Sequence, residues 1–170
     1  MLPEPLHPAV VHFPIALMAF LPLVAAVVLW RLHDGARLRT WGWVTLTATL
    51  VVAAGVVAQE TGEDQEERVE RVVPKEAIEA HHDAAHAFVF VAWVVLGLSL
   101  VGFAPGFVGR SARLVTLVGT LALAYFGWRV GDLGGKLVYQ HDAASAYTSD
   151  TVRVVPSVGP AEEREKPEER

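Results

Sequence analysis

The chain has 170 residues, of which 52% are hydrophobic, and it carries a formal net charge of −5 at pH 7. The length fits one domain, and the hydrophobic share together with a positive mean hydropathy indicates a membrane protein rather than an ordinary soluble domain. The chain contains no cysteine, which excludes disulfides, thiolate zinc sites, iron–sulfur clusters and covalently attached c-type haem. Any redox group or metal must therefore be held by histidine, carboxylate or backbone atoms.

Four hydrophobic segments follow one another along the chain. Three long stretches lack acidic and basic side chains apart from one histidine, and each approaches the about 20 residues that cross the hydrocarbon core of a bilayer. A fourth, shorter stretch continues through Arg129. We therefore predict an all-α integral membrane protein, an up-and-down four-helix bundle formed by residues 1–141. The expected spans are about 8–30, 40–59, 82–104 and 111–140.

The two ends of the chain lead to separate predictions. The residues before the first span lack the basic region of a cleaved signal peptide, so we expect this span to be retained. Residues 142–170 lose the apolar content of the spans and end in a run of charged side chains. Because such a segment buries little apolar surface, we predict a disordered polar tail over 142–170.

Positive charge sets the expected orientation. An up-and-down topology puts the two loops that follow spans one and three on the same side, and by the positive-inside rule that side is cytoplasmic. Both termini and the acidic loop Glu60–Glu79 are then outside, as expected for a multi-pass protein of the bacterial inner membrane. The arginines that carry this argument are Arg31, Arg37, Arg39, Arg110 and Arg113.

Six of the seven histidines are expected to gather at the outer face of the membrane. Spans one and three begin there, and spans two and four end there. At a helical rise of about 1.5 Å per residue, His12 and His86 lie at a similar depth, about one turn inside the boundary. Spans one and three stand diagonally in a simple four-helix square, so His12 and His86 are predicted to face each other across the bundle core.

Span four carries a stripe of small residues at three- and four-residue spacings, formed by Thr120, Ala124, Gly127, Gly131, Gly134 and Gly135. Close packing against a neighbouring helix would explain this stripe. A flat cofactor lying against the bare backbone would explain it as well. In that second interpretation Arg129 and Lys136 pair with the propionates of a haem, because guanidinium and ammonium groups bind carboxylates.

Three functional hypotheses follow from these patterns. The first is a b-type haem electron-transfer protein or subunit with His12 and His86 as axial ligands, since imidazole on both faces of the iron leaves no position open for substrate. The second is a non-haem site for copper, zinc or iron, ions that imidazole and carboxylate suit. Its candidate ligands are His7, His12, His82, His86, His141, Glu60 and Asp64.

The third hypothesis is a membrane scaffold or partner subunit without a cofactor, whose histidines only cap helices and satisfy hydrogen bonds. In any of the three cases His81 is expected to be solvated. The chain has no Gly-rich phosphate loop and no nucleophile elbow, so nothing indicates hydrolysis or nucleotide chemistry, and no nucleic-acid partner is expected. The expected partners are the lipid bilayer, a soluble or membrane redox protein, and further copies of the same chain.

Two stretches resemble the signatures of a bacterial family of predicted four-helix membrane proteins of unknown function. Residues 7–17, HPAVVHFPIAL, resemble the pattern HPxxVHFPIxL, and residues 134–141, GGKLVYQH, resemble the start of GGxLVYxHG. Asp142 stands where the second pattern has its last glycine. The likeness covers about residues 6–141. The resemblance implies that the protein acts together with respiratory redox proteins, because relatives are sometimes joined to Rieske-type or cytochrome domains.

Overall fold

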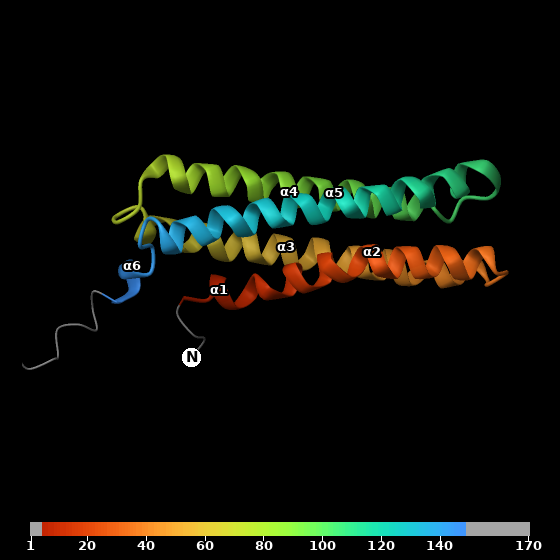
Figure 1. The fold of residues 1–170 in the computed structure, drawn as a ribbon, viewed down its shortest axis with the longest axis horizontal. Helices are drawn as coiled ribbons and strands as arrows, with labels where there is room; N and C mark the ends of the chain where they lie inside the picture. The colour runs from red at the N-terminus through yellow and green to blue at the C-terminus, as the bar shows by residue number, and fades with distance from the viewer. Residues whose placement is uncertain (1–4, 149–170) are drawn as a thin grey trace, which may run out of the picture.

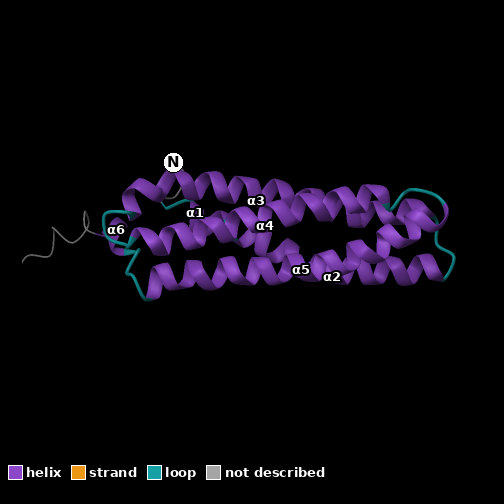
Figure 2. Ribbon diagram, turned by 90° about the horizontal axis from the view of Figure 1, so that it is seen from above, coloured by secondary structure: helices purple, strands orange, loops and turns teal. Residues whose placement is uncertain are grey.

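The computed structural model describes residues 5–148, and all regular secondary structure in that range is helical (Figures 1 and 2). The expected all-α architecture is confirmed, because four helices of this range are long and apolar enough to cross a membrane. In chain order the elements are α1 (His7–Val10), α2 (His12–His33), the 3₁₀-helix η1 (Leu38–Trp41), α3 (Gly42–Val69), α4 (Lys75–Val101), α5 (Gly106–Tyr139) and α6 (Ser145–Thr148).

The four long helices form an up-and-down bundle in which chain neighbours run antiparallel (Figure 1). α2 packs on α3 and α5, and α4 packs on the same two helices, so α2 and α4 stand diagonally as predicted. One end of the bundle holds α1, α6, the end of α3 and the start of α4, and we name it the histidine end. The opposite end holds the α2–α3 and α4–α5 connections, and we name it the arginine end.

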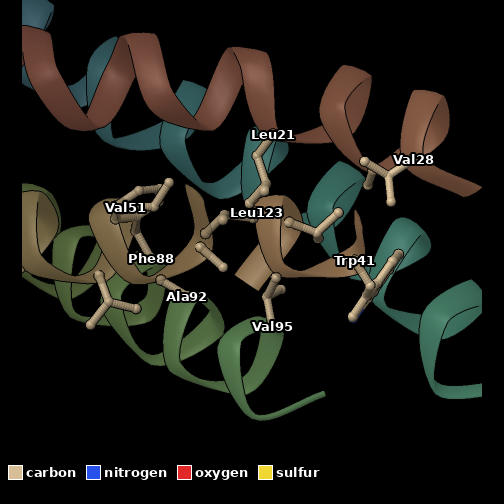
Figure 3. Close-up of a cluster of buried hydrophobic side chains, with 12 residues drawn as sticks. Leu21, Val28, Trp41, Val51, Phe88, Ala92, Val95 and Leu123 are labelled. Atoms are coloured by element: carbon tan, nitrogen blue, oxygen red, sulfur yellow. The ribbon is translucent and has the colours of Figure 1, made fainter. Parts of the chain in front are cut away.

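Apolar side chains from all four helices fill the middle of the bundle (Figure 3). Leu21 of α2 points toward Leu123 of α5, and Val51 of α3 and Phe88 of α4 lie beside them. The outer surface of the same helices is apolar too, with Phe20 61% exposed and Val118 66% exposed. Helices that are hydrophobic on every side are typical of membrane spans, since lipid covers the outward face.

The arginine end is closed by a buried tryptophan. The Trp41 indole N–H donates a hydrogen bond of 2.8 Å to the Ser99 carbonyl of α4. A Cβ atom on Gly102 would overlap the same indole, so the glycine admits the ring. Arg113 of α5 donates a hydrogen bond of 2.6 Å to the Gly102 carbonyl. Both connections at this end are thereby tied to one another.

The acidic segment differs from the expected loop. α3 continues to Val69 and α4 begins at Lys75, so only residues 70–74 connect the two helices. Glu, Gln and Arg are good helix formers, and they carry α3 beyond its hydrophobic part. Val73 and Ile78 are buried at the turn. The prediction of a long acidic loop over Glu60–Glu79 was therefore wrong.

Part of the segment assigned to the polar tail packs on the bundle. Ala143 is buried against Val73 and Ile78. The Gln65 amide of α3 donates to Tyr147 Oη at 2.9 Å, and its oxygen accepts from the Leu6 backbone N–H at 2.9 Å. Residues 142–148 are therefore joined both to α3 and to the N-terminal segment. The remaining part of the predicted disordered tail, 149–170, lies outside the described residues.

Candidate metal centre

Two groups of histidines lie at the histidine end, and they differ in the side chains and backbone that they contact. The first, named the surface cluster, consists of Gln59 and Glu63 of α3 with His82 and His86 of α4. The second consists of His7 of α1 and His81 of α4, which are both half-buried; it is named the buried pair after the buried Nδ1 atom of His81.

The surface cluster brings two imidazoles and one carboxylate together. His82 and His86 are four residues apart and share one face of α4. Their Nε2 atoms are 2.7 Å apart, and their ring centroids are 4.3 Å apart. Ligand atoms of Glu63, His82 and His86 all lie within 4.8 Å of one another. Glu63 and His86 are exposed and His82 is half-buried, so water reaches the group.

Gln59 connects the two helices within this cluster. Its side-chain amide donates a hydrogen bond of 3.0 Å to Glu63 Oε1, one turn further along α3. The same nitrogen lies 3.3 Å from His86 Nε2. The amide therefore orients the carboxylate and lies beside the imidazole that the carboxylate approaches.

This donor set suits a transition-metal ion. Imidazole and carboxylate bind zinc, copper, iron and nickel, and three protein ligands leave a fourth position for water or another ligand. The 2.7 Å between the imidazole nitrogens is a hydrogen-bond length. It is shorter than the separation of two ligands on a tetrahedral ion with bonds of about 2.0–2.1 Å, so metal binding requires the rings to open slightly. Both side chains have the exposure to do so.

The buried pair lies between helices. His7 Nδ1 is 2.9 Å from the Ala58 carbonyl oxygen of α3, and since a carbonyl only accepts, this nitrogen carries the proton. The His7 and His81 rings meet edge to face, with centroids 6.3 Å apart. His81 Nδ1 is buried, and the Val130 backbone of α5 lies beside the His81 ring.

Two glycines make room for these rings. A Cβ atom on Gly62 of α3 would lie 3.1 Å from His7 Cε1, and a Cβ atom on Gly134 of α5 would lie 3.1 Å from His81 Cε1. Such distances are tighter than ordinary van der Waals contact. Each imidazole of the buried pair therefore sits against the bare backbone of a neighbouring helix.

Residues 3–146 match the family described as predicted membrane protein (DUF2231), a family of unknown function. The chain belongs to the DUF2231 family. This match confirms the resemblance to a family of predicted membrane proteins. No curated protein and no solved structure matches the chain.

Both stretches on which the resemblance rests contribute to the histidine end of this DUF2231 protein. The first, residues 7–17, supplies His7 to the buried pair. The second, residues 134–141, begins with Gly134, on which His81 packs. The two stretches therefore flank the same pair of imidazoles, although His81 belongs to neither.

His12 and His86 were predicted to face each other across the bundle core, but in the structure they do not. Both side chains are exposed, and His86 lies against His82 and Gln59 on the α3–α4 side of the bundle. Further inside, Met18 and Phe88 occupy the space in front of Gly127, where a Cβ atom would overlap Met18. The diagonal placement of the helices was right, but the rotation of each helix about its own axis turns these two imidazoles away from the core.

Two sets of residues were expected to contact a haem: Arg129 and Lys136 its propionates, and Gly131 and Gly135 its face. Neither set lies next to either histidine group. Lys136 forms an ion pair of 2.6 Å with Asp132 on its own helix, and Arg129 is exposed. A Cβ atom placed on Gly131 or Gly135 would have no heavy atom of another side chain or helix within 4 Å. The small residues of α5 thus split into packed and open positions, and these two glycines are open.

Only some of the expected metal ligands lie close together in the structure. His82 and His86 come together, whereas Glu60 and Asp64 are exposed and lie outside the converging group. Glu63 takes the carboxylate position instead, because it is four residues after Gln59 on the helix face toward α4. His141 is half-buried after the end of α5 and is not among the converging ligands.

His81 was expected to be solvated, but it is half-buried and its Nδ1 atom is buried. The buried positions of α4 recur every three or four residues and include Ile78, Phe88 and Ala92. His81 is three residues after Ile78 and seven before Phe88, so it lies on the same buried stripe. Helical periodicity therefore contained the signal for its burial, although its partner His7 belongs to another helix and could not be identified from spacing.

Proposed function

We propose that this DUF2231 protein binds a transition-metal ion at the surface cluster, with Glu63, His82 and His86 as ligands. The observation that carries the proposal is the convergence of one carboxylate oxygen and two imidazole nitrogens within 4.8 Å. Zinc, copper and iron all accept this donor set. We further propose that the protein lies in the bacterial inner membrane with the histidine end outside, since the arginine end carries the basic loops.

The exposure of the cluster favours an exchangeable ion. Glu63 and His86 are open to solvent at the end of the bundle. With three protein ligands, a fourth position stays free for water or for a ligand from a donor or acceptor of the metal. We therefore infer a role in taking up or handing over the ion at the membrane surface rather than in holding it permanently.

The geometry favours this proposal over a b-type haem. A haem with two axial imidazoles requires both rings to point into one cavity from opposite sides. His12 and His86 are both exposed, and Met18 and Phe88 occupy the space beside Gly127. A hydrogen-bonded cluster without metal is the remaining alternative, because the same atoms lie at hydrogen-bond distances.

Metal binding by the detergent-purified protein tests the proposal. The wild-type protein should bind one zinc or cobalt ion measurable by titration calorimetry and by elemental analysis after dialysis. His86→Ala and Glu63→Gln each remove a ligand, so the affinity should fall by more than the about 10–100-fold typical of outer-shell changes. Gln59→Ala removes only the orienting amide and should cost about 10-fold.

His33→Ala is the matched control, because His33 is an exposed histidine at the arginine end. Its metal affinity should equal that of the wild type. Equal affinities in His33→Ala and His86→Ala would overturn the proposal. A Soret absorption band that is present in the wild type and lost in both His12→Ala and His86→Ala would also overturn it, in favour of haem.

A further inference from the structure

An apolar groove lies on the outside of the bundle between α2 and α3, close to the arginine end. Its volume is about 380 Å³, which is the size of a small-molecule pocket. Thr47 alone among the lining residues carries a hydroxyl, and this hydroxyl donates a hydrogen bond of 2.8 Å to the Trp43 carbonyl oxygen. The groove therefore offers an apolar surface. The lining residues are Leu23, Val24, Val27, Val28, Trp43 and Thr47.

Two exposed arginines lie one helical turn beyond the groove, one on each helix. Arg31 is four residues after Val27 on α2, so the two residues share one helix face. Arg39 is four residues before Trp43, and η1 continues directly into α3. Within the described part of the chain neither arginine takes part in an ion pair. Two positive charges therefore flank one end of an apolar groove.

Two exposed tryptophans indicate that these arginines lie at the edge of the membrane. Trp30 is 62% exposed and Trp43 is 64% exposed, and each lies within one turn of the α2–α3 connection. Tryptophan is enriched where the hydrocarbon core meets the lipid headgroups, because its ring is apolar and its N–H is polar. The groove is then at the depth of the acyl chains, and Arg31 and Arg39 are at the depth of the headgroups.

We propose that the groove between α2 and α3 binds an acyl chain of one anionic phospholipid, whose phosphate is bound by Arg31 and Arg39. Guanidinium groups bind phosphate through charge-assisted hydrogen bonds. The arginine end carries five arginines and one carboxylate, Asp34, so its positive charge favours anionic over zwitterionic headgroups. An acidic soluble partner would contact the same arginines but would leave the groove empty. The site does not depend on metal binding at the surface cluster, which lies at the opposite end of the bundle.

Lipid titration of the detergent-purified full chain, followed by native mass spectrometry, tests the headgroup contacts. Dioleoyl phosphatidylglycerol should bind about 25-fold more tightly than dioleoyl phosphatidylcholine, because each of the two arginines contributes about 1 kcal/mol, or about fivefold, toward an anionic headgroup. Arg31→Gln and Arg39→Gln should each lower the phosphatidylglycerol affinity about fivefold. Arg110→Gln is the matched control, since Arg110 is an exposed arginine of the same end on α5, and it should leave the affinity unchanged.

Filling the groove tests the acyl-chain contact while both arginines are kept. Val27 lines the groove and is 52% exposed, so Val27→Phe puts a larger side chain into the groove without changing the buried core. Overlap with a bound chain costs about 1–3 kcal/mol, so the phosphatidylglycerol affinity should fall about fivefold or more. Val118→Phe is the matched control, because Val118 is 66% exposed on α5 and does not line the groove. Its affinity should equal that of the wild type.

Three results would overturn the proposal. The first is equal affinity of the wild type for the two lipids. The second is an equal loss of phosphatidylglycerol affinity in Arg110→Gln and Arg31→Gln, which would indicate diffuse attraction to the arginine end rather than a site beside the groove. The third is an unchanged affinity in Val27→Phe, which would mean that the headgroup binds without a chain in the groove.

Discussion

Single residues at the histidine end are placed by the backbone of their neighbours. Asp142 adopts φ 55°, in the left-handed region that glycine enters freely but that L residues other than asparagine and aspartate rarely enter. This is the position at which the resembled pattern has glycine, and the positive φ supplies a physical reason for a glycine there. The turn at Asp142 brings Ala143 back onto Val73 and Ile78.

Replacing Asp142 by glycine should therefore stabilise the fold. The left-handed conformation costs an L residue about 1–2 kcal/mol, and Asp142→Gly removes part of that cost. We expect a higher midpoint of thermal unfolding in detergent for Asp142→Gly and a lower one for Asp142→Val, whose branched Cβ is least compatible with positive φ. Identical midpoints for the two variants would mean that the turn does not contribute to stability.

At the scale of one helix, α5 shows that similar residues serve different purposes. Gly127 and Gly134 admit the side chains of Met18 and His81, whereas Gly131 and Gly135 have nothing within 4 Å of a Cβ position. All four were parts of one stripe in the sequence, and spacing alone does not tell packed from open positions. The direction in which α5 faces α2 and α4 decides which glycines are packed.

Alanine substitutions at Gly127 and Gly131 should have opposite effects. Gly127→Ala overlaps Met18, and overpacking of this kind costs about 1–3 kcal/mol. Gly131→Ala meets open space and should gain about 0.5–1 kcal/mol, because glycine is a poor residue inside a helix. Denaturant unfolding of the two variants in the same detergent measures both changes. Stabilisation by Gly127→Ala would contradict the packing described.

At the scale of the whole molecule, the charges of the two ends point to one orientation. The basic residues lie in the connections of the arginine end, and the carboxylates lie where α3 and α4 leave the apolar part of the bundle. By the positive-inside rule we propose that the arginine end faces the cytoplasm. The proposed metal site at the surface cluster would then open to the outside of the inner membrane.

Cysteine labelling tests this orientation cleanly because the chain has no cysteine of its own. Glu67→Cys places an exposed thiol at the histidine end, and Asp34→Cys places one at the arginine end without removing a positive charge. A membrane-impermeant maleimide applied to spheroplasts should label Glu67→Cys and should label Asp34→Cys only after the membrane is permeabilised. The reverse pattern would place the proposed metal site on the cytoplasmic side.

The sequence by itself determined the number of spans, the up-and-down order and the gathering of histidines at one end. These features depend on hydrophobic length and on alternation of direction, which are properties of the chain alone. Only the tertiary structure decided which histidines meet. The rotation of each helix about its axis, set by side-chain packing such as Met18 on Gly127, turns His12 outward and His81 inward. A difference of one residue rotates a side chain by about 100° around a helix, so pairing across helices could not be read from depth.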